Sequence, residues 1–384
     1  MRTLIHNALG VDVRGEEPGT WVLFSEGLIV AAGTGAPPTD DLPSVGWVVD
    51  AAGARLVPGF VDLHCHGGGG SSFEDGAAAI AAALATHRAH GTTRSVVSFV
   101  AAPVQDLARR LALVAELTAS DPLVLGSHLE GPFLSPARRG AHAAEALTHP
   151  EHRSVESLLT AARGTLRQAT IAPELPGALE AIDALVAAGC AVAVGHTDAD
   201  AAGASAAFDR GATLLTHAFN AMAGIEARRG GPIGAAVADD RVTLELILDG
   251  RHVDSLVARL LFAAAPGRIA LVTDSMAAAG SGDGAYLLGT LPVTVRDGTA
   301  TLDGAGTLAG STLTQDAALR RAVLELGIDP ADAVAAVTST PARALGLDDR
   351  FGLLAEGYAA DAVLLDADWR VQRVWADGRE LPTV

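Results

Sequence analysis

Eight short apolar runs alternate with helix-length, alanine-rich segments through the middle of this 384-residue chain, and this alternation is the strongest constraint on its fold. The runs span residues 57–66, 92–99, 123–131, 167–174, 191–198, 212–220, 242–250 and 268–275. Apolar strands separated by helices are typical of parallel β–α–β units, in which the helix returns the chain over the face of the sheet. Eight such units predict a closed (β/α)8 TIM-like barrel, whose active site is built at the C-terminal ends of its strands.

The two ends of the chain have a different pattern. Residues 1–57 and 348–384 consist of short β-rich runs separated by Gly and Asp turns, without helical periodicity. We therefore predict a small β-sandwich domain built from both termini and a catalytic barrel over 58–347. A further β-hairpin is expected within 281–310, where VTVRDGTATLDG carries an Asp-Gly turn.

Charge and hydropathy narrow the class of partner. The formal net charge of −18 argues against binding to nucleic acid or to an anionic membrane surface, although a small anionic substrate responds to local charge instead. No apolar run reaches membrane-spanning length, and the N-terminal residues lack the pattern of a secretory signal. Cys65 and Cys190 are the only cysteines, so no disulfide framework is expected. These features predict a soluble, cytoplasmic protein.

Side chains that commonly bind metals recur at the ends of the apolar runs. His64 and His66 are two residues apart, so that on a strand both imidazoles point to the same face. The C-terminal ends of barrel strands meet at one mouth, so we expect the residues of this kind to converge there. Four imidazoles and two carboxylates predict one or two divalent ions with open coordination positions. The six residues are His64, His66, Glu130, His196, His217 and Asp274.

Such a site predicts a hydrolytic reaction. A divalent ion lowers the pKa of a bound water toward neutrality, and this supplies a nucleophile at physiological pH. Asp274, at the end of the last run, is placed to accept the proton of that water and to return it to a leaving group. A serine or cysteine nucleophile is disfavoured, because the chain has no GxSxG motif and Cys65 would point away from its two histidine neighbours. The expected reaction is metal-assisted hydrolysis of an amide or a related bond.

Several motifs resemble the N-acetylglucosamine-6-phosphate deacetylase family of the amidohydrolase superfamily. The HxH pair is shared by many amidohydrolases, whereas EGPF, HAFNAM and DGxHVD in this order are much more specific to the deacetylases. The resemblance implies a homodimer that hydrolyses the acetamide of a phosphorylated amino sugar, in amino-sugar catabolism or cell-wall recycling. The segments that carry it are PGFVDLHCHGGGG (58–70), HLEGPFLSPARRGAH (128–142), VGHTDA (194–199), THAFNAM (216–222), ILDGRHVD (247–254), LVTDSMAAAG (271–280) and LAGSTLTQD (308–316).

The resemblance also implies roles for individual residues. Glu130 would hold one ion together with His196 and His217. His64 and His66 would hold a second ion, since family members without this pair use one metal. The ions would be Zn²⁺ or Fe²⁺, with Mn²⁺ or Co²⁺ as alternatives. Asp274 would be the general acid and base as well as a metal ligand. The positions that match substrate contacts are His142, Asn220, Ala221, Arg228, His252 and Leu308.

Two other interpretations stay open at this point. The chain could be a different amidohydrolase, such as a dihydroorotase-like or deaminase-like enzyme, in which Arg228 and His252 bind something other than a sugar phosphate. It could also be a non-catalytic barrel kept as a binding module. The second alternative is disfavoured, because none of the six predicted metal-site residues is missing.

Overall fold

A computed structural model describes residues 2–37 and 46–383. The chain forms two compact units, and each is assembled from segments that are distant in sequence. The first unit comprises Met1–Asp62, His87–Arg94 and Gln315–Val384, and the second comprises Leu63–Thr86 and Ser95–Thr314.

Eight strands form the barrel sheet, in the order β15-β14-β13-β12-β11-β10-β9-β6. The pairings from β9 to β15 are all parallel, and each strand pairs with the next barrel strand along the chain. This order confirms the predicted (β/α)8 barrel. The strands are β6 (Phe60–Asp62), β9 (Thr92–Val100), β10 (Val124–Glu130), β11 (Leu166–Ile171), β12 (Ala191–Val194), β13 (Leu214–Leu215), β14 (Thr243–Ile247) and β15 (Ile269–Val272).

The segments that follow β6 and β15 are joined by backbone hydrogen bonds. The N–H of Asp274 donates to the carbonyl of His64 at 2.7 Å, and the N–H of His66 donates to the carbonyl of Ser275 at 2.8 Å. These bonds place the residues after the first and last barrel strands side by side. The chain between β7 (Gly67–Gly68) and β8 (Ser71–Ser72) then turns back on itself.

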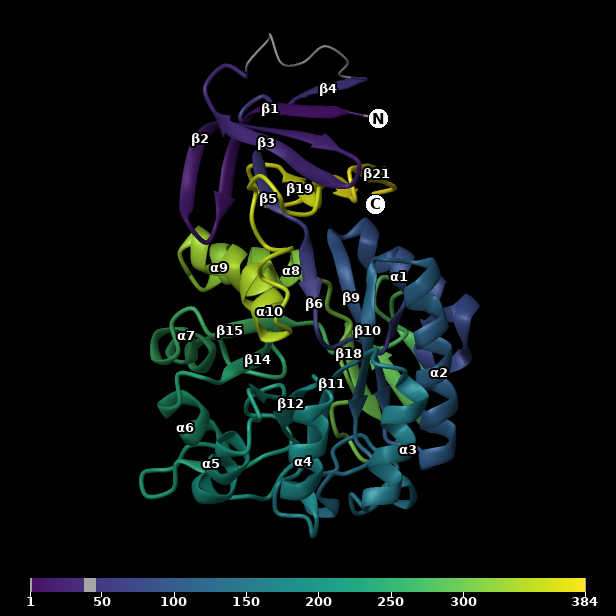
Figure 1. Ribbon diagram of the computed structural model, residues 1–384. Coiled ribbons are helices and arrows are strands. Elements are labelled where there is room, and N and C mark those ends of the chain that lie inside the picture. The colour runs from purple at the N-terminus through teal and green to yellow at the C-terminus, as the bar shows by residue number, and fades with distance from the viewer. Residues whose placement is uncertain (1, 38–45, 384) are drawn as a thin grey trace. The chain divides into compact units, whose positions relative to one another are not determined.

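Helices lie around the outside of the barrel strands, as Figure 1 shows for α2 to α7. Helix α2 buries Leu107, Leu111 and Val114, whose spacing puts them on one face and explains why this segment packs as a helix. The helices of this series are α1 (Ala77–Ala89), α2 (Val104–Ser120), α3 (His152–Ala162), α4 (Ala178–Ala187), α5 (Ala201–Asp209), α6 (Gly231–Ala238) and α7 (Ser255–Ala264). No helix among the described residues is both long enough and apolar enough to cross a membrane.

Both termini build one sheet in the first unit, which confirms the predicted small β domain. The order is β21-β20-β19-β5-β1-β2-β3, with β4 also paired to β1. Phe24, Leu56 and Trp375, from three strands of this sheet, lie in its buried apolar cluster. The strands are β1 (Thr3–Asp12), β2 (Gly15–Ser25), β3 (Leu28–Thr34), β4 (Trp47–Asp50), β5 (Arg55–Pro58), β19 (Ala362–Leu365), β20 (Val371–Ala376) and β21 (Arg379–Leu381).

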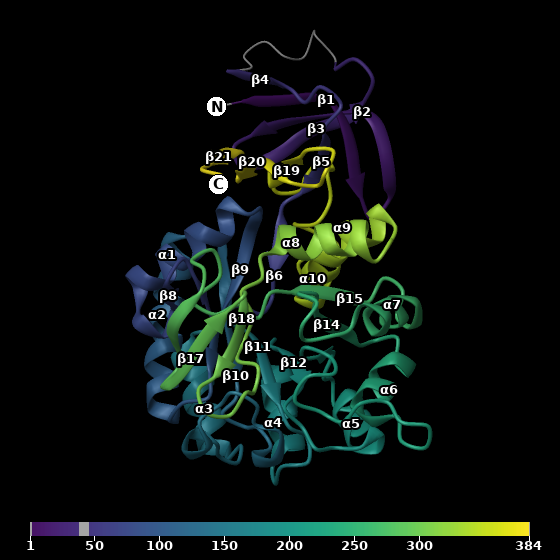
Figure 2. The ribbon, with the colours of Figure 1, turned by 180° about the vertical axis from the view of Figure 1, so that it is seen from behind.

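The remaining strands and α-helices lie between the barrel strands and the C-terminal strands in sequence. The predicted hairpin is present as an antiparallel three-stranded sheet, two strands of which are labelled in Figure 2. Its strands are β16 (Gly284–Leu288), β17 (Leu291–Arg296) and β18 (Thr299–Leu302). Three helices follow: α8 (Gln315–Arg320), which continues as a π-helical turn over Arg321–Glu325, α9 (Pro330–Val337) and α10 (Ser339–Ala344).

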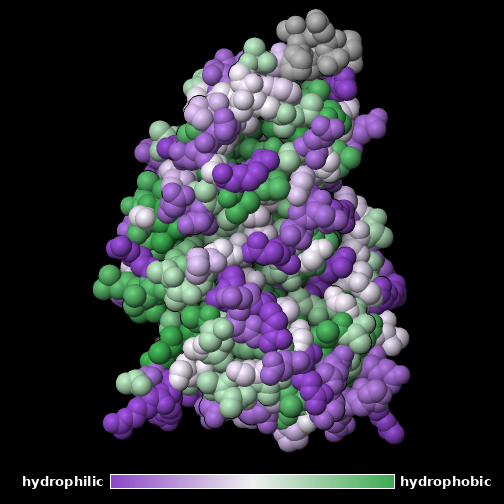
Figure 3. Space-filling model, turned by 60° about the vertical axis from the view of Figure 1, so that its left-hand side comes forward, coloured by the Kyte–Doolittle hydropathy of each residue, from purple (hydrophilic) through white to green (hydrophobic). Residues whose placement is uncertain are grey.

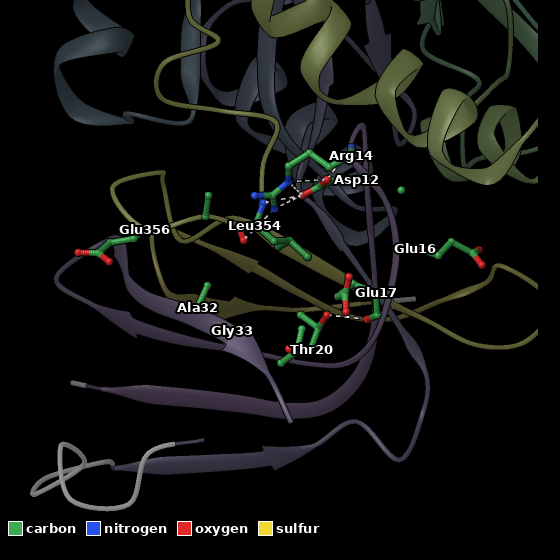
Figure 4. Close-up of a pocket in the computed structure, with 13 residues that line it drawn as sticks. Asp12, Arg14, Glu16, Glu17, Thr20, Ala32, Gly33, Leu354 and Glu356 are labelled. Carbon is green, nitrogen blue, oxygen red and sulfur yellow. Dashed lines mark hydrogen bonds and ion pairs between the residues drawn. The ribbon is translucent and has the colours of Figure 1, made fainter. Parts of the chain in front are cut away.

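The first unit contains a hollow of about 530 Å³, lined by residues of β1, β2, β3 and 354–356. Figure 4 shows Arg14 turned toward Asp12, whereas Glu16 and Glu356 point away from this pair. Nε of Arg14 donates to Oδ1 of Asp12 at 3.0 Å, and this hydrogen bond raises the pKa of the guanidinium. The cation in this hollow is therefore already paired with a carboxylate.

A buried ion pair ties three segments of the first unit together. Nε of Arg94 donates to Oδ2 of Asp361 at 2.6 Å, and both side chains are less than one-tenth exposed. Asp361 also accepts the backbone N–H of Asp377 at 2.8 Å. Asp377 forms a second ion pair with Arg94.

We predict that Asp361→Asn lowers the free energy of unfolding by about 3 kcal/mol, because Arg94 would stay buried without its main counter-charge. Glu380→Gln is the control, since it breaks an exposed ion pair with Arg373 and should cost less than about 1 kcal/mol. Urea unfolding of the two variants measures both values. Equal losses would contradict the structural role given to Asp361.

Candidate active site

The six residues of metal-binding type lie together at one end of the barrel. All six are buried, with at most 8% of any residue exposed. His64 and His66 follow β6, Glu130 ends β10, and His196, His217 and Asp274 each lie two residues beyond the ends of β12, β13 and β15. The carboxyl ends of five barrel strands therefore deliver one cluster, although the role of each residue in it stays a prediction.

The carboxylate of Glu130 lies at the centre of the cluster. Its Oε1 atom is 3.0 Å from Nε2 of His196 and 3.0 Å from Nε2 of His217. Its Oε2 atom is 3.1 Å from Nε2 of His66, and Nε2 of His64 lies 3.4 Å from Oε1. Four imidazoles from three different strand ends thus direct the same ring atom at one carboxylate.

The spacing of these atoms fits a divalent ion. Nε2 of His196 and Nε2 of His217 are 3.0 Å apart, and Nε2 of His64 and Nε2 of His66 are 3.1 Å apart. Ligand atoms around a tetrahedral ion with bonds of ~2.0–2.2 Å are separated by about 3.3–3.6 Å, slightly more than the atoms of these two pairs. Oδ1 of Asp274 lies 3.4 Å from Nε2 of His66, which extends the same donor set. The structure therefore contains a buried His, Glu and Asp site that could hold a metal ion.

Hydrogen bonds on the far side of two rings strengthen this interpretation. Nδ1 of His64 lies 3.2 Å from Oε2 of Glu245, and Nδ1 of His196 lies 2.9 Å from the carbonyl oxygen of Arg138. A carboxylate and a carbonyl only accept, so each Nδ1 carries a hydrogen. When such a ring is neutral, its Nε2 atom therefore directs a lone pair toward Glu130. Lone pairs that face a carboxylate repel it unless a cation lies between them.

His142 differs from these rings, although its Nε2 atom also faces Oε2 of Glu130, at 3.4 Å. The N–H of Ala101 donates to Nδ1 of His142 at 3.1 Å, so the neutral ring carries its hydrogen on Nε2. Burial lowers the pKa of His142 to about 4, which keeps the ring neutral near pH 7. The ring therefore presents a donor to the site, and a donor suits a substrate oxygen better than a metal ion.

The carboxylates and imidazoles of the cluster keep one another ionised, although burial disfavours charge on each of them. Burial disfavours ionised carboxyls, but the positive charge of nearby protonated imidazoles, His64 foremost, outweighs it. The pKa of Glu130 is therefore held well below its usual range, and that of Asp274 falls to about 2. Burial also disfavours a cationic ring, but hydrogen bonds to Asp274 and Glu130 raise the pKa of His66 to about 10. Both carboxylates are therefore ionised at neutral pH, which favours occupation of the site by positive charge.

Three of the six residues have an unusual backbone. His196, His217 and Asp274 have φ angles of 47°, 24° and 44°, in the left-handed region that residues other than glycine rarely adopt. Each such residue costs about 1–3 kcal/mol and persists only where the surrounding structure fixes it. The strain coincides with the functional cluster, where each chain leaves its strand.

Glu245 and Gln168 lie inside apolar runs of the sequence, and neither was predicted as a functional residue. Both are fully buried, and Nε2 of Gln168 donates to Oε1 of Glu245 at 2.6 Å. His128, two residues before Glu130 on β10, is also fully buried, with its ring nitrogens 3.0 Å from Oγ of Ser98 and 2.9 Å from Oγ1 of Thr170. A carboxylate within the run LELILDG was the signal available in the sequence.

The residues proposed for substrate contact lie in several loops of the second unit. Nδ2 of Asn220 donates to the carbonyl of His217 at 3.2 Å, and the carbonyl of Ala221 accepts the N–H of Thr197 at 3.2 Å. Ala221 also has a left-handed φ of 50°. Asn220 and Ala221 are therefore tied to the chain segments that carry the clustered histidines.

The remaining positions proposed for substrate contact are His252, Arg228 and Leu308. Burial disfavours charge on His252, but a hydrogen bond to Asp249 at 2.7 Å raises its pKa. Arg228 is exposed, whereas its neighbour Arg229 pairs with Glu226 at 2.8 Å. Leu308 is half-buried and forms an isolated bridge with Thr301. The structure thus places these residues without testing their contact with a substrate.

Comparisons with known proteins agree with this arrangement. N-acetylgalactosamine-6-phosphate deacetylase of Escherichia coli O157:H7 is 38% identical, over 84% of this chain and 87% of its own length. N-acetylglucosamine-6-phosphate deacetylase of Bacillus subtilis is 34% identical, over 83% of each chain.

Solved structures extend the likeness to the whole chain. N-acetyl-D-glucosamine-6-phosphate deacetylase of Mycobacterium smegmatis, in a mutant form in complex with N-acetyl-D-glucosamine-6-phosphate, superimposes with a TM-score of 0.94 at 41% identity and 100% coverage of both chains. The enzyme of Thermotoga maritima gives a TM-score of 0.89 at 30% identity, with 98% of this chain and 99% of that chain covered. Residues 55–381 match the amidohydrolase family. The chain therefore belongs to the amidohydrolase family.

Proposed function

We propose that this protein hydrolyses the acetamide of N-acetyl-D-glucosamine 6-phosphate to D-glucosamine 6-phosphate and acetate. The observation that carries the proposal is the buried Glu130 carboxylate, with the Nε2 atoms of His64 and His196 directed at it. The relatives at 33–38% identity support the substrate class, because their names specify deacetylation of an amino-sugar 6-phosphate. The two alternatives, a different amidohydrolase and a non-catalytic barrel, lack support of this kind.

The chain's own residues divide the chemistry between them. A divalent ion held by the histidines and Glu130 would lower the pKa of water toward neutrality and polarise the acetamide carbonyl. Asp274 is ionised at neutral pH, so it can accept the proton of the attacking water and deliver it to the nitrogen of the departing amine. His142 can donate from Nε2 to a substrate oxygen, since its Nδ1 already accepts from Ala101.

The phosphate requires local positive charge in a chain whose net charge is −18. Arg228 has a planar guanidinium that can bind phosphate with two hydrogen bonds, and its exposure leaves it accessible. His252 gains positive character from Asp249 and can add a donor. Asn220 and the backbones of Ala221 and Leu308 would complete the contacts to the sugar.

We expect two ions per chain, one held by Glu130, His196 and His217 and one by His64 and His66, with Asp274 as a further ligand. Zn²⁺ or Fe²⁺ fits the mixture of imidazole and carboxylate ligands, and Mn²⁺ or Co²⁺ is the alternative. The two pairs of Nε2 atoms, each with a separation near 3 Å, support two positions.

A homodimer and a cytoplasmic location stay predictions from the sequence. One observation supports an interface: Leu256 and Leu260 of α7 are 68% and 69% exposed and lie one helical turn apart on the same face. Figure 3 shows hydrophobic residues interspersed with hydrophilic ones on one face of the molecule, and scattered apolar residues of this kind are common on monomers.

The relative from Escherichia coli O157:H7 is named for the sugar epimer at C4, so N-acetyl-D-galactosamine 6-phosphate is the second candidate substrate. Acetate release from both phosphorylated sugars and from unphosphorylated N-acetyl-D-glucosamine separates the candidates. The proposal expects N-acetyl-D-glucosamine 6-phosphate to have the highest kcat/KM. No acetate release from either phosphorylated sugar would overturn the deacetylase assignment.

Two adjacent arginines provide a matched test of phosphate binding. We predict that Arg228→Ala lowers kcat/KM for the phosphorylated sugar about 10- to 100-fold, since a hydrogen bond to a charged group contributes about 1.5–3 kcal/mol. Arg229→Ala should change kcat/KM less than about twofold, because Arg229 pairs with Glu226 on the surface. Steady-state kinetics of both variants measure these changes. Equal losses of kcat/KM in Arg228→Ala and Arg229→Ala would contradict the assignment of Arg228 to phosphate binding.

The role of Asp274 makes a separate prediction. Asp274→Asn should lower kcat by about 10²- to 10⁴-fold, because the amide side chain can no longer accept a proton. Asp183→Asn on α4 is the control, since Asp183 is exposed and pairs with Arg210. Rates are measured by acetate release at saturating substrate. Unchanged turnover in Asp274→Asn would remove Asp274 as the acid and base.

A further inference from the structure

Glu245 is a buried carboxylate that the proposed chemistry does not use directly. It lies in the middle of β14, and none of its surface is exposed. Burying an ionised carboxylate is strongly unfavourable unless hydrogen-bond donors surround it. Three donors do so here: Nε2 of Gln168 at 2.6 Å from Oε1, and Nδ1 of His64 at 3.2 Å and the N–H of His217 at 3.3 Å from Oε2.

These contacts connect Glu245 to both halves of the cluster. On one side it faces the ring of His64. On the other it binds the backbone of His217, and its own carbonyl accepts the N–H of Ala218 at 2.8 Å. The backbone of His217 is left-handed, with a φ of 24°, so these two bonds help to hold a strained turn.

The histidines nearby are supported unequally. Nδ1 of His196 donates to a backbone carbonyl, whereas Nδ1 of His64 faces a carboxylate. Among the described residues, Nδ1 of His66 and Nδ1 of His217 have no hydrogen-bond partner. In the pair formed by His64 and His66, a side chain therefore sets the tautomer of the His64 ring, and that side chain is Glu245. An anionic partner on Nδ1 also makes Nε2 a stronger ligand.

We propose that Glu245 is a positioning residue, which keeps the hydrogen of His64 on Nδ1 and thereby sets the metal affinity of the His64 and His66 half of the site. The inference rests on the metal-dependent function proposed above. Glu245 contacts neither a substrate nor the expected ion, and it acts through His64. The half formed by Glu130, His196 and His217 does not depend on Glu245 for the tautomer of any ring.

Two substitutions separate the hydrogen bond of Glu245 from its charge. In Glu245→Gln the side-chain oxygen can still accept from His64, while the new amide group would face Nε2 of Gln168. Gln168 can rotate its amide to accommodate this, because its Oε1 atom has no partner among the described residues. Glu245→Leu removes both the acceptor and the charge. Glu74→Gln is the control, a partly buried carboxylate that accepts from the N–H of Val100 at 3.3 Å.

The experiment is equilibrium dialysis of the full-length chain against buffered Zn²⁺, with bound metal measured by mass spectrometry. We expect two ions on the wild type and on Glu74→Gln. The weaker site, which we assign to His64 and His66, should lose affinity about 10- to 100-fold in Glu245→Leu and less in Glu245→Gln. This is the usual effect of losing a group that supports a metal ligand. The tighter site should lose less affinity than the weaker one, because Glu245 sets no ring tautomer there, although Glu245→Leu also removes the acceptor of the His217 N–H.

Loading with Co²⁺ gives a second readout, because the absorption bands of that ion report ligand geometry at each site. The bands of the weaker site should change more than those of the tighter site in the two variants. Thermal unfolding checks that each variant is folded, and if Glu245→Leu is not, Glu245→Gln decides. Equal affinities in wild type and variants, an equal loss at both sites, or a single ion on the wild type would each overturn the proposal. A wild type that binds no Zn²⁺ at all would instead refute the proposed function.

Discussion

The burial of the Glu130 carboxylate among imidazoles is the interaction on which the rest of the site depends. Its two oxygens lie within 3.4 Å of Nε2 atoms of five histidines, counting His142. Such a cluster is stable only if positive charge balances it, either as protons on the rings or as a metal cation. The hydrogen bonds on Nδ1 of His64 and of His196 place lone pairs on the inner side of these two rings. Binding of a cation is the arrangement that uses those lone pairs.

The barrel makes this cluster at the cost of backbone strain. Parallel strands bring distant segments to one rim, and the segments that follow β6 and β15 are bonded there through His64 and Asp274. Three residues of the site then adopt left-handed φ angles immediately after their strands end. Inside the barrel, Gln168 donates a hydrogen bond to Glu245, and Glu245 in turn contacts His64 and His217 of the cluster. The hydrogen bonds that stabilise this end of the barrel therefore also position the residues of the proposed metal site.

Much of this architecture could be predicted, because its signals are periodic. The eight barrel strands and the small sheet from both termini follow from apolar runs and turn residues, and the cluster follows from the position of its residues at strand ends. Glu245 could not be assigned in the same way, since it lies inside a run whose apolar neighbours indicate only a buried strand. The left-handed angle of His217 and the tautomers of His64 and His142 depend on contacts between distant segments. Local sequence does not encode these features.

The central claim is that Glu130 organises a metal site, and metal analysis of Glu130→Gln tests it most directly. The wild type and Glu130→Gln would be purified without added metal and checked for folding by circular dichroism. Each would then be dialysed against buffered Zn²⁺ and its bound ions measured. The account predicts at least one ion per wild-type chain and less than about one-tenth of that amount in Glu130→Gln, because a central charged ligand is lost. A folded Glu130→Gln protein that binds as much metal as the wild type would contradict it.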